Sequence, residues 1–136
     1  MPVRGLLHPA GGPLLRGEVH GPRGALAGHL LIDTGAHLSA VDRAVAHALE
    51  LPSHRAAEWR AVGGGENHPH LAPLRRATVA LPGDLRHWEL DLVEVANLEH
   101  TVGGFRVIAL LGWDFLEGCR LVLDGPARTF SLELPR

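Results

Sequence analysis

Short runs of Val, Leu and Ile recur along the chain, and seventeen glycines and ten prolines separate them at short intervals. Apolar runs of this length between turn-forming residues are typical of an all-β fold. Two runs, residues 14–19 and 25–32, flank the sequence Gly-Pro-Arg-Gly at 21–24, which predicts a β-hairpin. The second strand of this hairpin ends directly before Asp33.

Alternation of apolar and polar residues over 77–81 and over 88–92 predicts two half-buried strands. Near the C-terminus, residues 121–123 and 129–134 lie on either side of Asp-Gly-Pro, which predicts a closing hairpin. The inward face of that hairpin is expected to hold Phe130, Leu132 and Leu134.

One segment follows a helical period instead. Its apolar residues lie at i, i+4, i+7 and i+8, namely Val41, Val45, Ala48 and Leu49. With Ser39 as N-cap and Pro52 as stop signal, the pattern predicts a short helix over residues 40–50.

Two apolar runs end in similar turns. Residues 30–35 read Leu-Leu-Ile-Asp-Thr-Gly, and residues 109–114 read Ala-Leu-Leu-Gly-Trp-Asp. Each runs an apolar strand into a turn with a glycine and an aspartate, which indicates two related half-domains.

Composition narrows the possible classes of function. The 136 residues, 46% of them hydrophobic, suit a single domain over residues 1–136. With a net charge of −2 and 21% charged residues, the chain has no extended basic surface for binding nucleic acid, which is therefore not expected as a partner. No apolar run reaches membrane-spanning length, and the N-terminus lacks a secretory apolar stretch. We therefore expect a soluble cytoplasmic protein with no membrane partner, although a chain whose leader has been removed would look the same.

No metal or organic cofactor is predicted. Cys119 is the single cysteine, so it forms no internal disulfide and brings no second thiol to a metal. We expect it to be a small buried residue. His68 and His70 are separated by Pro69 and have no third ligand nearby, which favours an exposed loop.

The candidate chemistry lies at Asp33, a carboxylate presented at the end of an apolar strand. Gly35 permits a backbone conformation or a close approach that a Cβ would obstruct. Thr34 supplies a hydroxyl that can brace a neighbouring loop, and Ala36 leaves room beside the carboxylate.

Hydrolysis by carboxylates needs two of them, one to take a proton from water and one to donate a proton. The Asp-Thr-Gly triplet occurs once. A symmetric dimer would bring two copies of Asp33 together. A pair of Asp33 and Asp114 within one chain is the alternative, but the context of Asp114 favours a turn or helix-cap role.

Residues 32–36, Ile-Asp-Thr-Gly-Ala, followed by Ser39, resemble the active-site motif of retropepsin-like aspartic peptidases. Residues 61–66 resemble the glycine-rich flap of that family, and residues 110–116 resemble its second motif. The resemblance covers roughly residues 14–134, and the predicted helix is similar to one found in the cellular and bacterial branch.

The resemblance implies a closed acid-protease β-barrel with one or two short helices, acting as a homodimer. It implies an aspartic endopeptidase in which Asp33, Thr34 and Gly35 form the catalytic loop and peptides bind as extended strands. The substrate-binding residues it implies are Ala36, His37, Val62, Gly63, Gly64 and Gly65. His37 stands where viral members usually carry an aspartate that binds the substrate backbone.

Two other functions remain compatible with the sequence. The same fold could serve as a non-catalytic peptide-binding or dimerisation module. It could also form a structural homo-oligomer with no ligand. The intact triplet around Asp33 favours the peptidase, because a binding module has no physical need for an acid there.

Overall fold

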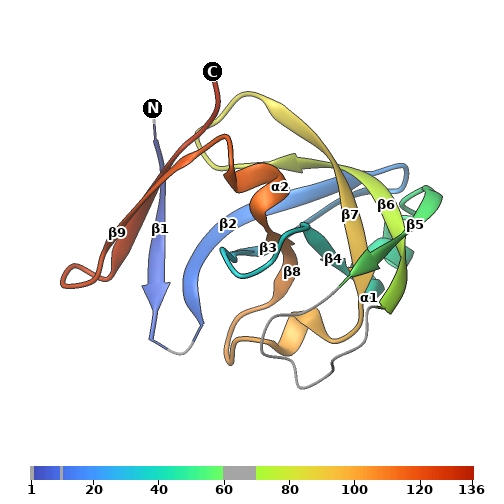
Figure 1. Ribbon diagram of the computed structural model, residues 1–136, viewed down its shortest axis with the longest axis horizontal. Coiled ribbons are helices and arrows are strands. Elements are labelled where there is room, and N and C mark those ends of the chain that lie inside the picture. Colours follow the sequence, from blue (N-terminus) through green and yellow to red (C-terminus); the bar gives the residue numbers. More distant parts are fainter. Residues whose placement is uncertain (1, 10, 60–69) are drawn as a thin grey trace.

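A computed structural model describes residues 2–9, 11–59 and 70–136 (Figure 1). The strands are β1 (Val3–His8), β2 (Gly12–Gly21), β3 (Gly24–Ile32), β4 (Ala40–Asp42), β5 (Ser53–Trp59), β6 (His70–Ala80), β7 (His87–Val95), β8 (Val107–Leu111), β9 (Arg120–Asp124) and β10 (Thr129–Glu133). The helices are α1 (Arg43–Ala48), α2 (Trp113–Leu116) and the 3₁₀ helix η1 (Leu98–His100).

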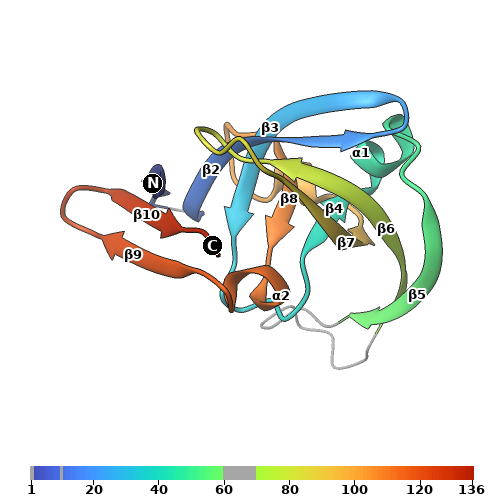
Figure 2. The ribbon, with the colours of Figure 1, turned by 90° about the horizontal axis from the view of Figure 1, so that it is seen from above.

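The ten strands of the described chain form one sheet in the order β5-β6-β7-β4-β8-β3-β2-β1-β10-β9. An additional pairing joins β2 to β6, with Val19 opposite Val79. This pairing closes β2, β3, β8, β4, β7 and β6 into a ring. The strands β1, β10 and β9 continue the sheet beyond β2, and the β9–β10 hairpin projects from one side of the molecule (Figure 2). The predicted all-β class with short helices is confirmed.

Both faces of the central strands are buried, because successive side chains of a strand point to opposite faces. Leu15, Leu30 and Ile108 belong to one apolar cluster. Their chain neighbours Leu14 and Leu31 belong to a second cluster. The sheet thus separates two apolar layers, and the second layer lies on the face that Asp33 continues, two residues beyond Leu31.

Both predicted hairpins are present. Strands β2 and β3 pair from Leu14 opposite Leu31 to Gly21 opposite Gly24. Strands β9 and β10 form the closing hairpin. The predicted strand over residues 77–81 overlaps the end of β6. The predicted strand over residues 88–92 lies within β7. In the closing hairpin Phe130 and Leu132 are buried as expected.

The helix predicted over residues 40–50 is shorter than expected, and its predicted cap is wrong. Residues 40–42 form β4 instead, where Ala40 lies opposite Leu110 on one side and Val93 on the other. Pairing on two sides outweighs the local helical pattern. The N-cap is Asp42, whose Oδ2 accepts a hydrogen bond from the Ala44 N–H at 2.9 Å.

Asp42 also holds a distant segment. Its Oδ1 accepts hydrogen bonds from the N–H groups of Leu98 and Glu99, at 2.8 and 3.2 Å. The buried Asp42 carboxylate therefore accepts hydrogen bonds from backbone N–H groups of both α1 and η1. In the part of the chain that the structure covers, no helix combines the length and the apolar content needed to cross a bilayer.

Candidate active site

The two apolar runs that end in similar turns lie side by side in the fold. Strands β3 and β8 are parallel neighbours, with Leu31 opposite Leu110 and Ile32 opposite Leu111. The backbone N–H of Asp33 continues this ladder by donating to the carbonyl of Leu111 at 2.9 Å. The turns after both strands therefore meet at the same end of the two strands, and both lie near the middle of the view in Figure 1.

The turn after β3 folds around the side chain of Asp33. The Gly35 N–H donates to Oδ1 of Asp33 at 2.9 Å, and the Ala36 N–H donates to the Asp33 carbonyl at 3.2 Å. Gly35 does not lie in the left-handed region. A Cβ at Gly35 would instead lie 3.2 Å from Oδ1 of Asp33. Of the two reasons expected for this glycine, close approach is the one that the geometry supports.

The residues of the loop after β3 differ in how far they are exposed to solvent. Asp33 is half-buried, Ala36 is buried, and Thr34, Gly35 and His37 are exposed in the single chain. Within the described part of the chain, no cation pairs with the Asp33 carboxylate. An aspartate held by one N–H and left without a counter-ion is available to bind a water or a second carboxylate.

The turn after β8 holds its aspartate differently. The carboxylate of Asp114 accepts from the Ser39 N–H at 3.0 Å to each oxygen and from the Ser39 hydroxyl at 2.6 Å. The Ser39 hydroxyl oxygen in turn accepts from the Gly112 N–H at 3.0 Å. Ser39 is fully buried. It therefore links the two turns, and this link is the structural role of Asp114.

The backbones of the two turns also interlock. The first N–H groups of α2, those of Trp113 and Asp114, donate to the carbonyls of Ala36 and His37 at 2.8 and 3.2 Å. These N–H groups have no partner inside the helix, so the loop satisfies them. Gly112 sits at the crossing point, where a Cβ would lie 2.7 Å from the carbonyl oxygens of both Ala36 and Leu38.

The supporting roles of two of these residues were not predicted. Ser39 was named with the active-site motif and expected as a helix cap, and Gly112 was named only as part of the second motif. The available signal was the glycine placed between an apolar strand and a short helix, which often marks close backbone approach. Helix capping by Asp114 is not observed, because the N-cap of α2 is Gly112 and has no side-chain cap.

The flap-like residues Val62, Gly63, Gly64 and Gly65 lie outside the described residues, as do His68 and Pro69. Cys119 is half-buried, and burial raises the pKa of its thiol. No group of three His, Cys, Asp or Glu side chains positioned for a metal occurs among the residues that the structure covers.

Comparison with known proteins identifies the family. The sequence profile of the aspartyl protease family matches residues 16–115. The chain belongs to this family, and the resemblance drawn from the motifs is confirmed.

Two solved structures match most of this chain. A retropepsin-like aspartic protease from Rickettsia conorii is 16% identical, with a TM-score of 0.58 over 98% of this chain and 91% of that one. The retroviral protease-like domain of Ddi1 from Leishmania major is 14% identical, with a TM-score of 0.48 over 90% and 92%. Among curated proteins no significant match is found.

Proposed function

We propose that this protein is an aspartic endopeptidase that acts as a homodimer, with Asp33 of each copy supplying one of two catalytic carboxylates. The observation that carries the proposal is the contrast at the sheet edge. Asp114 is bound by Ser39, whereas the Asp33 carboxylate accepts one N–H and pairs with no cation of the described chain. Membership of the aspartyl protease family supports the same conclusion.

The second carboxylate must come from another copy. Both oxygens of Asp114 accept hydrogen bonds from Ser39, so using Asp114 as a proton donor would break the link between the two turns. A twofold axis near Thr34 and Gly35, which are exposed in the single chain, would bring two Asp33 loops together without disturbing that link. The Thr34 hydroxyl is then free to bind the neighbouring loop.

The chemistry follows from two carboxylates that share one proton. The ionised Asp33 takes a proton from a bound water as the water oxygen attacks the scissile carbonyl carbon. The protonated Asp33 of the other copy donates its proton to the carbonyl oxygen. When the tetrahedral intermediate collapses, the carbon–nitrogen bond breaks and the nitrogen leaves with the proton that the first Asp33 took from water. The second Asp33 regains a proton from a hydroxyl of the intermediate as the new carboxyl group forms, so the pair again shares one proton. The pair titrates as a unit.

Substrates are peptides bound in extended form, with contacts from Ala36, His37 and the flap-like residues Val62 and Gly63–Gly65. The proposal places the protein in the cytoplasm and includes no cofactor.

The decisive test is the Asp33→Asn variant in a peptide-library digest from mildly acidic to neutral pH. We expect cleavage to fall by about 10³-fold or more, the range of general acid–base catalysis, while circular dichroism and sedimentation stay unchanged. Unchanged cleavage by a clean Asp33→Asn preparation contradicts the proposal. A protein that retains peptides but cuts none is instead a binding module, and a strictly monomeric chain removes the dyad.

A further inference from the structure

The strand β9 forms one edge of the sheet. It ends the strand order and, within the described chain, pairs with β10 alone. The backbone groups along its outer side have no partner strand, and such an edge is a template for pairing with another chain. Val122 is 43% exposed and Leu123 56% exposed, although both are apolar. An edge with these properties is suited to being covered by a further strand.

The strand at the opposite end of the sheet, β5, is less regular. Its pairing with β6 shifts register between Ser53 and Arg55, and an irregularity of this kind interrupts the row of backbone groups that a further strand needs. The pairing of β9 with β10 has no such shift, from Arg120 opposite Glu133 to Asp124 opposite Thr129. Of the two ends of the sheet, β9 is therefore the better template.

The sequence of β9 is complementary to itself when it is read in the opposite direction. Its five residues are Arg-Leu-Val-Leu-Asp, with Val122 at the centre. A second β9 that runs antiparallel about a twofold axis at Val122 would place Arg120 opposite Asp124 of the other copy. Leu121 would lie opposite Leu123 of the other copy, and the two Val122 side chains would meet on the axis.

Charge distinguishes this register from its neighbours. Opposed residues of an antiparallel pair share a face, so the nearest alternatives are centred on Leu121 or Leu123. They would place Arg120 or Asp124 opposite Val122, with no opposite charges together. Neither Arg120 nor Asp124 forms an ion pair within the described chain. Both charges are therefore available to a partner strand, and the register centred on Val122 matches them.

The same register continues the apolar core from one copy to the other. On β10, Phe130 lies opposite Leu123 and Leu132 opposite Leu121. Phe130 and Leu132 are buried in the larger apolar cluster, and Leu121 packs against it. The exposed Leu123 would lie opposite Leu121 of the second copy. The row across β10 and β9 of one copy and β9 and β10 of the other would then be apolar throughout.

The strand β9 lies on the side of the molecule that carries the Asp33 loop. It follows α2 after a short turn, and the first N–H groups of α2 donate to the carbonyls of Ala36 and His37 in that loop. Figure 2 shows β9 as the lower strand of the projecting hairpin, with α2 on the same lower side. One twofold axis can therefore pass both β9 and the exposed tip of the Asp33 loop.

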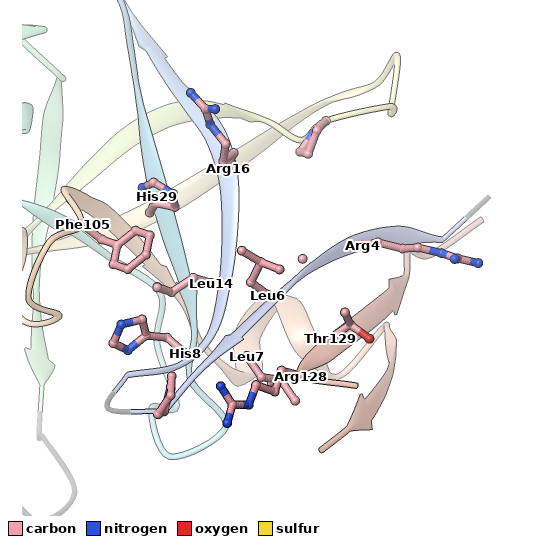
Figure 3. A pocket seen from close by; sticks show the side chains of 13 residues that line it. Arg4, Leu6, Leu7, His8, Leu14, Arg16, His29, Phe105, Arg128 and Thr129 are labelled. Carbon is pink, nitrogen blue, oxygen red and sulfur yellow. The ribbon is translucent and has the colours of Figure 1, made fainter. Parts of the chain in front are cut away.

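A cavity of about 680 Å³ between β1 and the strands β2 and β3 is another apolar surface that a second copy could cover (Figure 3). Leu6, which is 62% exposed, lies at this cavity. Arg4, Arg16 and Arg128 also line it, and its described lining includes no carboxylate. Two copies that met here about a twofold axis would bring like charges together. The charges therefore favour β9 over the cavity as the contact between copies.

We infer that β9 pairs antiparallel with β9 of a second copy about a twofold axis at Val122. The pairing joins the two sheets and brings the two Asp33 loops together. This inference rests on the proposed function for the purpose of the contact, because it names the surface through which the second copy supplies its carboxylate.

The first test reverses each charge separately and then mixes the two variants. Arg120→Asp opposes two carboxylates, and Asp124→Arg opposes two guanidinium groups. In sedimentation we expect each dimer to dissociate at about 30-fold higher concentration, because two attractive exposed pairs become repulsive. An equal mixture should recover the wild-type value, since every pair in the mixed dimer has opposite charges. Arg23→Asp, exposed at the turn between β2 and β3, is the matched control and should change nothing.

A cysteine cross-link measures the register directly. In a Cys119→Ser background, Val122→Cys places two thiols opposite each other on the axis, within the separation that a disulfide allows. We expect oxidation to give a covalent dimer on a non-reducing gel. Leu123→Cys should link more slowly, because it faces Leu121 of the other copy. Leu6→Cys, exposed at the cavity, should stay unlinked.

A dimer that neither charge reversal weakens, or that does not link through Val122→Cys, overturns the inference. If that protein still cuts peptides, the peptidase proposal stands and the dimer uses another surface; a link through Leu6→Cys would place that surface at the cavity. If the mixture recovers and Val122→Cys links but the wild type cuts nothing, the contact stands and the peptidase proposal fails. If a charge variant does not fold by circular dichroism, the cross-link decides alone. A wild type that stays monomeric at assay concentration overturns the contact and the shared site together.

Discussion

The turns after β3 and β8 follow similar apolar strands, but their aspartates differ in how they are hydrogen-bonded. Both follow parallel, paired apolar strands. Asp33 accepts one N–H, from Gly35, while Asp114 accepts both the N–H and the hydroxyl of buried Ser39. A carboxylate surrounded by donors stabilises the fold, and one left with few donors stays available for chemistry. The fold uses the second turn to hold the first in place.

The glycines of the two turns should give the largest difference in stability. A Cβ at Gly112 meets two carbonyl oxygens at 2.7 Å, whereas a Cβ at Gly35 meets the carboxylate of Asp33 at 3.2 Å. We expect Gly112→Ala to lower the free energy of unfolding by about 3 kcal/mol. Gly35→Ala should cost less than about 1 kcal/mol, because the Asp33 side chain can rotate away. Urea denaturation measures both, and equal losses would contradict the contrast.

The next largest difference in the free energy of unfolding should come from replacing the two aspartates. Asp114→Ala leaves the buried Ser39 N–H without its acceptor, so we expect a loss of about 2 kcal/mol in urea denaturation. Asp33→Ala should change the free energy of unfolding by less than about 0.5 kcal/mol. A double-mutant cycle of Asp114→Ala with Ser39→Ala should show a coupling of about 1 kcal/mol or more. Additive losses would mean that the link between the turns contributes nothing.

The smallest effect concerns the strands before the turns, where His29 of β3 lies opposite Val107 of β8. Burial and Arg16 lower the pKa of His29 below its value of 6.5 in the unfolded chain. Below that pH the unfolded state binds a proton that the folded state does not, so stability falls as the pH drops through about 6.5.

His29→Gln should flatten this dependence by less than about 1 kcal/mol, because the ring is only partly buried. Thermal unfolding from pH 7.5 to 5 compares the variant with the wild type. An identical slope in both proteins would rule out His29 as the cause.

Local patterns predicted the parts of the fold that depend on neighbours in the chain. The β2–β3 hairpin, the closing hairpin and the strand that delivers Asp33 all follow from turn residues and alternation. The likeness of the two strand-to-turn segments predicted two related half-domains, which stays a prediction, and in the fold the two segments pair in parallel.

Contacts between distant segments were not predictable in the same way. The local pattern made Ser39 look like a helix cap. Its true partner, Asp114, lies 75 residues further on, so neighbours in the chain do not reveal the contact. Residues 40–42 form a strand because β7 and β8 flank them. The strand β1 pairs with β2 and with the distant β10, and its sequence had no signal strong enough to predict it. The predicted roles of Asp33, Thr34, Gly35, Ala36 and His37 remain predictions.

The central claim is that Asp33 is half of a site, and a mixing experiment tests it most directly. Wild-type protein and Asp33→Asn are unfolded together, refolded at a constant total concentration, and assayed on one cleaved peptide. If both copies must supply a carboxylate, activity follows the square of the wild-type fraction, so an equal mixture keeps about a quarter. If each chain works alone, an equal mixture keeps about half, and that linear dependence would contradict the account.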